Sequence, residues 1–310
     1  MGWVKIIAYL IAVFFIINAV IFGMYLFSEN PSSEILNAVG YNSGVQREIS
    51  AGSEVVQFEK NMRFNHNTLS FFINSDCDQS KKMRMMRAFS EVQSQTEIIL
   101  FRPAEESVAD ILIGCSEESY ETEKNTFISG EGGPTEYFNL TMYPLIKKGK
   151  ILLYQESSCD YPITELHELF HVFGFDHINK SQYIMYPYID CKQIINPELI
   201  NQLKEIYSIE PLPELYFMNV SAVKTDNYLN FSVQINNDGL NDAENVNLNV
   251  YADNEKVDNF DLKTIAIGSG QVFYVNNLKL PSSNIKTVKL EIYYSGKEYK
   301  KDNNVIELSV

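Results

Sequence analysis

Five residues in one short stretch have the types and the spacing of a metal site. His167 and His171 are four positions apart, so on a helix they lie on one face, one turn apart. Two imidazoles placed in this way can bind one Zn²⁺ ion at N–Zn distances of about 2 Å. Glu168 can act as a general base on a water molecule at the metal. Gly174 tolerates the left-handed conformation that ends a helix, and His177 can then serve as a third ligand.

Three protein ligands leave the fourth position of a tetrahedral zinc ion open, which is typical of a catalytic site and not of a structural one. The alternative is an amphipathic core helix that carries two histidines by chance. The chain has 4 histidines, and all but His66 lie in this stretch. This concentration favours the metal site.

The stretch His167–His177 resembles the zinc-binding consensus H-E-x-x-H-x-x-G-x-x-H of the metzincin metalloproteases. Metzincins also have a downstream methionine turn, and Met185-Tyr186-Pro187 is similar to the Met-Tyr-Pro of the matrixins, the matrix-metalloproteinase branch. Residues 196–207 resemble the closing helix of that family, and the resemblance covers roughly residues 60–208. It implies an α+β catalytic domain with a twisted mixed sheet, an active-site helix and a C-terminal helix.

The resemblance implies further site residues and one catalytic Zn²⁺ ion. Met185 would form an apolar floor under the imidazoles, because its thioether is a poor zinc ligand. Pro187 and Tyr188 resemble the matrixin segment that walls the pocket for the side chain after the scissile bond. Matrixins commonly hold a second, structural zinc ion, but here His66 alone remains, and one histidine cannot build that site.

A glycine-rich segment precedes the predicted substrate-binding strand. Composition predicts a loop at Gly130–Pro134, followed by Thr135–Asn139. In matrixins a similar loop leads into the antiparallel edge strand beside the cleft, which implies that Thr135 and Tyr137 bind an extended peptide. The alternative is an ordinary hairpin loop. Structural Ca²⁺ is compatible with this region, although no ligand set of the required size is visible.

Apolar patterns predict the elements that position the site. The strand–helix–strand order of these elements favours parallel neighbours in the sheet. We expect Asp160 to cap the active-site helix, with Pro162 in its first turn. The predicted helix with apolar residues at helical spacing is Lys81–Gln95, and the predicted strands are Leu69–Ile73, Ile98–Phe101, Ile111–Gly114 and Ile151–Tyr154.

The four cysteines form no C-x-x-C pair, so a zinc ribbon or a thioredoxin-like motif is not supported. An even number of cysteines outside the cytosol suggests two disulfides, and the sequence alone leaves three pairings open. In the matrixin-like fold we hypothesise Cys77–Cys115, because each residue follows a strand and these strands should be neighbours. Cys159–Cys191 would clamp the metal-binding segment.

The amino terminus has the pattern of a membrane anchor. Ile6–Phe27 is an apolar run of about 22 residues, long enough to cross a bilayer core of about 30 Å. Lys5 precedes it and Glu29 and Glu34 follow it, so the positive-inside rule predicts a single-pass protein of the cell membrane with a cytoplasmic amino terminus and an extracellular catalytic domain. A cleaved signal peptide is the alternative.

After Pro211-Leu212-Pro213 the sequence pattern changes, and these two prolines mark a domain boundary. Alternating apolar and polar residues predict about seven short strands in an all-β, Ig-like sandwich of about 95 residues. The run from Asn236 to Val246 resembles adhesion-type sandwiches of the CARDB kind. The predicted sandwich contains no catalytic cluster, so we interpret it as a binding or spacing module that could recognise a cell-surface ligand.

These patterns divide the 310 residues into four parts. We expect a transmembrane anchor at 1–28, a polar tether at 29–60, a zinc metalloprotease domain at 61–209 and a β-sandwich at 214–310. The tether contains no cysteine, so the thiol-on-zinc latch of many matrixin pro-segments cannot operate from it. The net charge of −15 makes nucleic acid an unsuitable partner.

The expected function is that of a membrane-anchored, extracytoplasmic zinc endopeptidase acting on an extended peptide or protein substrate. The alternative is a cell-surface adhesion or binding protein with a non-catalytic metal site. The intact Glu168 favours the enzyme, because a structural metal site does not need a base.

Overall fold

The computed structural model describes residues 55–117, 121–123, 126–154 and 158–310. The expected anchor at 6–27 and most of the expected tether lie outside these residues. Within the described ranges, no helix is long and apolar enough to cross a membrane. Residues 55–60, which we assigned to the tether, pack on the catalytic domain: Val55 and Gln57 are buried there.

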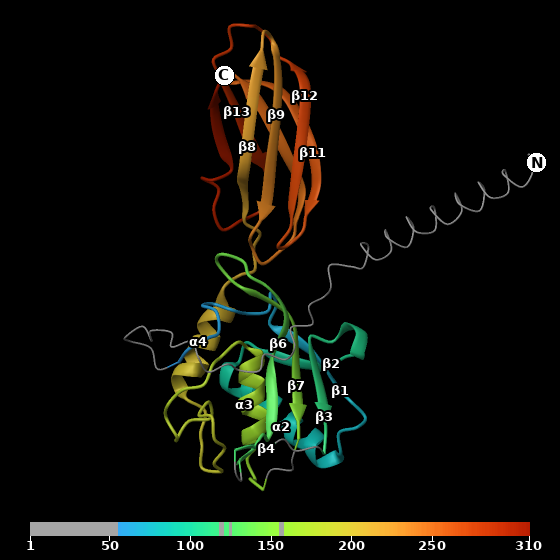
Figure 1. Cartoon of the computed structure of the whole chain (residues 1–310), viewed down its shortest axis with the longest axis vertical. Coiled ribbons are helices and arrows are strands. Elements are labelled where there is room, and N and C mark those ends of the chain that lie inside the picture. Colours follow the sequence, from blue (N-terminus) through green and yellow to red (C-terminus); the bar gives the residue numbers. More distant parts are fainter. Residues whose placement is uncertain (1–54, 118–120, 124–125, 155–157) are drawn as a thin grey trace, which may run out of the picture. The chain divides into compact units, whose positions relative to one another are not determined.

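A five-stranded mixed sheet forms the centre of the first domain, in the order β2-β1-β3-β7-β6 (Figure 1). The first four strands of this order are parallel to their neighbours, as the strand–helix–strand order predicts, and β6 is antiparallel to β7 at the edge. The strands are β1 Thr68–Ile73, β2 Leu100–Pro103, β3 Ile111–Cys115, β6 Gly130–Phe138 and β7 Leu145–Leu153. A short hairpin of β4 Glu121–Glu123 and β5 Thr126–Phe127 precedes β6.

In the described part of this domain there are also three helices and one 3-10 turn: α2 Gln79–Thr96, η1 Glu106–Val108, α3 Ile163–Val172 and α4 Pro197–Ser208. The carboxylate of Asp78 caps α2, and Asn196 caps α4. The prediction that Asp160 caps α3 was wrong. Pro162 occupies the N-cap position without a side-chain hydrogen bond, and the carbonyl of Asp160 accepts instead from Nη1 of Arg87 at 2.9 Å.

The glycine-rich segment 130–134 was predicted to be a loop and is the first half of strand β6. Two of its three glycines, Gly130 and Gly132, serve close packing and not a turn. A Cβ atom added at Gly132 would lie 2.8 Å from Cα of Glu168 and would overlap the carbonyl of that residue. At Gly130 an added Cβ would lie 2.9 Å from Cγ of Glu168. The edge strand therefore runs directly against α3, which only residues without a side chain allow.

Both hypothesised disulfides are present in the structure. Cys77, in the connection between β1 and α2, is bonded to Cys115 at the end of β3, with Cα atoms 4.9 Å apart. Cys159 and Cys191 join the segment before α3 to the segment after the methionine turn, with Cα atoms 5.1 Å apart.

The second domain is a β-sandwich of two antiparallel sheets, β11-β10-β13-β14 and β12-β9-β8 (Figure 1). Alternating apolar residues of both sheets fill one core, as the period-two pattern predicts. The strands are β8 Leu215–Thr225, β9 Tyr228–Asn237, β10 Ala243–Ala252, β11 Glu255–Ile265, β12 Gly270–Lys279, β13 Thr287–Tyr293 and β14 Val305–Ser309.

Candidate metal centre

The structure brings the Nε2 atoms of three histidines together. The distances are 3.0 Å between His167 and His171, 3.1 Å between His167 and His177, and 3.2 Å between His171 and His177. His167 and His171 lie one turn apart on α3. His177 reaches the same point because the chain reverses at Gly174, whose φ of +84° is in the left-handed region that glycine tolerates.

Backbone carbonyls determine which ring nitrogens carry hydrogen. Nδ1 of His167 lies 2.6 Å from the carbonyl of Ile184, and Nδ1 of His171 lies 2.7 Å from the carbonyl of Phe175. A carbonyl can only accept, so both Nδ1 atoms are protonated and both Nε2 atoms carry a lone pair in the neutral rings. The 3.0 Å contact between these two Nε2 atoms is therefore not a hydrogen bond. Facing lone pairs fit a cation between them, and three imidazoles are a typical zinc ligand set.

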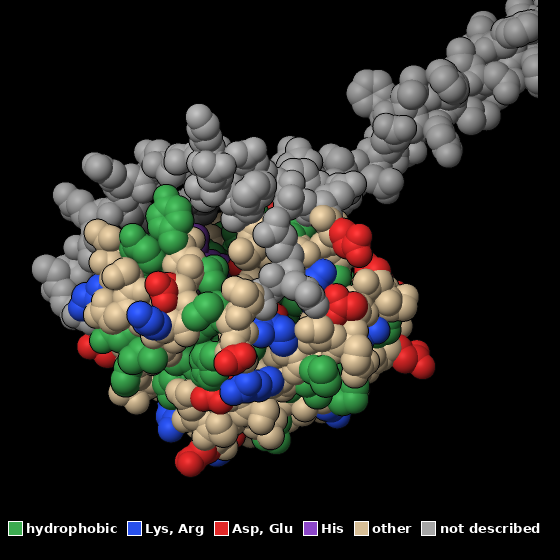
Figure 2. Space-filling model, turned by 90° about the horizontal axis from the view of Figure 1, so that it is seen from below, with side chains coloured by type: hydrophobic (Ala, Val, Ile, Leu, Met, Phe, Trp, Pro, Cys, Tyr) green, Lys and Arg blue, Asp and Glu red, His purple; other side chains and the backbone are tan. Residues whose placement is uncertain are grey.

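Burial keeps the three rings neutral. It lowers the pKa of His167 well below the ordinary value, with the neighbouring His171 acting in the same direction. Burial likewise lowers the pKa of His171 to about 4 and that of His177 below its usual value. Neutral imidazole is the form that binds metal. His167 and His171 are buried and His177 is partly buried. Figure 2 shows small purple areas of histidine side chain on this face.

Glu168 of α3 is buried where this helix packs against the edge strand β6. Burial raises the pKa of its carboxyl to about 8, and the charges of Glu131 and Glu165 act in the same direction. A cation bound at the adjacent histidines acts in the opposite direction, because it favours the carboxylate. Glu168 is thus a carboxyl group whose protonation depends on its immediate surroundings.

The methionine turn contributes a main-chain atom as well as its side chain. Met185 is fully buried, and its carbonyl accepts from the amide of Ile178 at 2.9 Å. The preceding residue, Ile184, supplies the carbonyl that orients His167. This turn therefore holds both the first ligand and the segment after the third.

The four residues expected to bind substrate lie on the surface. Tyr188 is 58% exposed, and Pro187 beside it is also exposed. Thr135 and Tyr137 are exposed on β6, where a register shift next to Thr135 interrupts the pairing with β7. Among the strands of the described ranges, β6 has no partner on its other edge. Its free N–H and C=O groups fit the addition of an extended chain.

The segment Val55–Phe58 supports the metal centre and was missed in the sequence. The amide of Phe58 donates to the carbonyl of Gly174 at 2.7 Å, and the amide of Asp176 donates to the carbonyl of Val56 at 2.8 Å. The ring of Phe58 is stacked on that of His171, with centroids 5.9 Å apart and planes 12° apart. The sequence contains little sign of this, because an apolar pair and a phenylalanine after a polar tether match no motif.

Gln57 adds side-chain hydrogen bonds between the segment Val55–Phe58 and the end of α3. Its side-chain amide donates to the carbonyl of Phe173 at 3.2 Å and to that of Met62 at 2.9 Å. The turn that carries His177 is therefore held from outside by residues that precede the first strand.

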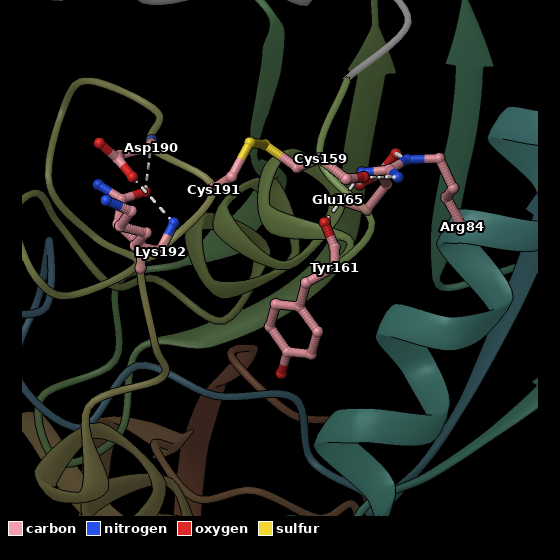
Figure 3. The surroundings of a disulfide bond; sticks show 8 residues. Arg84, Cys159, Tyr161, Glu165, Asp190, Cys191 and Lys192 are labelled. Atoms are coloured by element: carbon pink, nitrogen blue, oxygen red, sulfur yellow. Dashed lines mark hydrogen bonds and ion pairs between the residues drawn. A yellow bond between two sulfur atoms is a disulfide. The ribbon is translucent and has the colours of Figure 1, made fainter.

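Arg84 of α2 fixes the start of the active-site helix (Figure 3). Its guanidinium binds the carboxylate of Glu165 through Nε at 2.8 Å and Nη2 at 3.1 Å. It also donates to the carbonyls of Cys159 and Tyr161. Because the Cys159–Cys191 disulfide adjoins these carbonyls, the ion pair and the disulfide together anchor the helix that bears the first two ligands.

Comparison with known families agrees with the two domains. Residues 63–208 match the model of the Matrixin family, and residues 212–307 match the model of the CARDB family. Residues 63–208 are thus similar to matrixin domains, which suggests a zinc metallopeptidase, and residues 212–307 are similar to CARDB domains. No curated protein matches the chain significantly.

Two solved structures resemble the CARDB part. One is the CARDB domain of a Pyrococcus furiosus protein in complex with di-metal ions, with 15% identity, a TM-score of 0.26, and coverage of 32% of this chain and 88% of that chain. The other is a domain of a Methanosarcina acetivorans protein described as a cell surface protein, with 16% identity, a TM-score of 0.26, and coverage of 31% and 88%.

Proposed function

We propose that this protein is an extracytoplasmic zinc endopeptidase in which Glu168 is the general base. The observation that carries the proposal is the convergence of three Nε2 atoms within 3.2 Å of one another, at least two of them with lone pairs fixed by Nδ1–H contacts to carbonyls. Three neutral imidazoles leave one position of a tetrahedral ion for a water molecule or a substrate.

The chain's own residues have separate tasks in this reaction. His167, His171 and His177 hold the metal, which when bound supplies the Lewis acidity that makes a water molecule more acidic and polarises the scissile carbonyl. Glu168 accepts a proton from the attacking water and passes it to the leaving amine. Its burial excludes bulk water from this exchange.

Substrate binding is assigned to the free edge of β6. An extended peptide would pair with the main chain there, near Thr135 and Tyr137, and so bind without a strict requirement for sequence. Pro187 and Tyr188 would wall the pocket for the side chain after the scissile bond, as the matrixin resemblance implies.

The proposed location is the outer face of the cell membrane. The apolar run 6–27 would be the anchor, with the amino terminus in the cytoplasm. Two disulfides are consistent with an oxidising compartment for the catalytic domain. The CARDB domain would act as a binding or spacing module at the cell surface.

A second candidate is an adhesion or binding protein with a non-catalytic metal site, which the CARDB match favours. The two functions differ in what they require of Glu168. A purely structural zinc site is closed by a fourth protein ligand and has no use for a buried carboxyl group beside it.

Substitution of Glu168 tests the enzyme against the binding protein. We expect Glu168→Ala to keep zinc bound, measured by elemental analysis, and to lose at least about 10²-fold in the rate of peptide-library cleavage, because the base is gone. Glu205→Gln, on the exposed side of α4, is the control and should cleave normally. Cleavage by Glu168→Ala at the original rate would remove Glu168 from its role. An inactive wild-type protein with full zinc content would favour the binding protein.

A further inference from the structure

A pair of buried carboxylates lies in the sandwich, outside the histidine site. Glu214 directly precedes β8 and is 4% exposed, and Glu298, between β13 and β14, is 9% exposed. Among the residues that the structure describes, neither carboxylate forms an ion pair with lysine or arginine. Buried acidic groups without a cation are costly, so these two require an explanation.

Neutral donors contact all four carboxylate oxygens. For Glu214 the donors are Nδ2 of Asn303 at 2.8 Å and the amide of Lys300 at 2.8 Å. For Glu298 they are Nδ2 of Asn304 at 2.7 Å and, at a long 3.4 Å, the amide of Leu215. Asn303 and Asn304 are adjacent in the chain, and Leu215, whose amide contacts Glu298, is adjacent to Glu214, so the two pairs form one cluster.

The cluster also contains amide oxygens without a donor. Oδ1 of Asn303 and Oδ1 of Asn304 are buried and accept no hydrogen bond from the described residues. Asn304 as a whole is only 5% exposed. Each oxygen belongs to an amide group whose nitrogen contacts a glutamate of the cluster. A buried oxygen that accepts nothing is unfavourable unless another group binds it.

We propose that Glu214, Glu298, Asn303 and Asn304 bind one Ca²⁺ ion in the sandwich. Carboxylate and amide oxygens are the ligands that calcium prefers. Two carboxylates and two amides offer about six oxygens, the lower end of the range of about six to eight that calcium takes. The cluster contains neither imidazole nor thiolate, which sets it apart from the zinc ligands of the histidine site.

The cation would join the two sheets of the sandwich. Glu214 leads into β8, the edge strand of one sheet, and Asn304 leads into β14, the edge strand of the other. Bound calcium would fix the connection between β13 and β14 to the start of β8. Burial raises the pKa of Glu298, although the hydrogen bonds from Leu215 and Asn304 and the charge of Lys301 act in the opposite direction. A bound cation would favour the carboxylate form.

A third glutamate of the same sandwich provides a matched control. Glu291 on β13 also accepts from an asparagine amide, Nδ2 of Asn249 at 3.0 Å, and from the hydroxyl of Tyr251 at 2.7 Å. Here the amide oxygen is satisfied, because Oδ1 of Asn249 accepts from Asn259 at 2.7 Å. The hydrogen bond from Asn249 holds the pKa of Glu291 below its usual value. This pair has no need of a cation.

The test is calorimetric titration of CaCl₂ into the full-length, zinc-loaded protein at constant ionic strength, with MgCl₂ in a parallel titration. We expect one Ca²⁺ per chain with a Kd of about 10⁻⁴ to 10⁻³ M, as in extracellular calcium modules, and a rise of several degrees in the Tm of the sandwich. Glu298→Gln should weaken binding at least about tenfold, whereas Glu291→Gln should bind as the wild type does.

Three results would overturn the proposal. The first is a wild-type protein that shows neither calcium heat nor a Tm shift up to about 10 mM, well above the expected Kd, which decides the matter even if Glu298→Gln does not fold. The second is an equal response to Mg²⁺, since a chain of net charge −15 attracts divalent cations without a site. The third is a folded Glu298→Gln protein that binds calcium with wild-type affinity.

Discussion

Main-chain carbonyls direct both helical histidines toward the metal. The carbonyl of Ile184 orients His167 and the carbonyl of Phe175 orients His171, and both carbonyls belong to segments that follow the helix. The direction of each Nε2 lone pair therefore depends on how these segments are held, because a shift of a carbonyl turns the ring bonded to it. Supporting residues of this kind are expected to affect metal affinity without touching the metal.

Phe58 is the supporting residue that makes ring contact with a ligand. We expect Phe58→Ala to weaken zinc binding by about tenfold or more, the lower end of the effect of outer contacts on metal affinity. The substitution removes the ring stacked at 5.9 Å on His171. Competition with a chromogenic chelator measures the affinity, and Phe58→Tyr, which keeps the ring, should bind zinc normally. Unchanged affinity in Phe58→Ala would mean that the main-chain contacts of this segment suffice.

At the scale of elements, the contact between β6 and α3 positions the general base. Gly130 and Gly132 lie against Glu168 and leave no room for a side chain, whereas an added Cβ at Gly133 would meet nothing within 4 Å. Alternate residues of a strand point to opposite faces, so the two sensitive glycines share one face and Gly133 lies on the other. One strand thus contains both the sensitive positions and an internal control.

Gly132→Ala should be destabilising and should impair catalysis. The added methyl group would overlap the carbonyl of Glu168, so the strand or the helix must move, at a cost of about 1–3 kcal/mol as in other overpacked sites. Gly133→Ala should change the free energy of unfolding by less than about 1 kcal/mol. Urea unfolding gives the stabilities and peptide cleavage gives the rates. Equal behaviour of the two variants would refute this account of the glycines.

These glycines also mark how far the sequence predicts the structure. The spacing of His167, His171 and His177 predicted their convergence, because helical periodicity and one glycine turn determine it. A glycine needed for a turn and one needed for close packing look alike in a sequence, so β6 was predicted to begin five residues late. The ion pair between Arg84 and Glu165 joins positions 81 residues apart, and no local sequence pattern predicts such a contact.

At the scale of the whole molecule, the two domains have separate large cores. One cluster of buried apolar residues lies within residues 55–207 and the other within 215–292. The histidine site lies in the first range and the carboxylate cluster adjoins the second. Metal binding at either place should therefore stabilise the domain that contains it, since a ligand stabilises only the folded unit that binds it.

Removal of zinc should consequently lower the Tm of the matrixin transition and leave the Tm of the sandwich transition unchanged. A ligand present at about 1,000 times its Kd stabilises its domain by about 4 kcal/mol, which corresponds to a Tm shift on the order of 10 °C for a domain of roughly 150 residues. Differential scanning calorimetry of the full-length protein, stripped of zinc and then reloaded, should shift the matrixin transition by about this amount. Calcium is held constant, so the sandwich transition should stay in place. A parallel shift of both transitions would show that the two domains unfold as one unit.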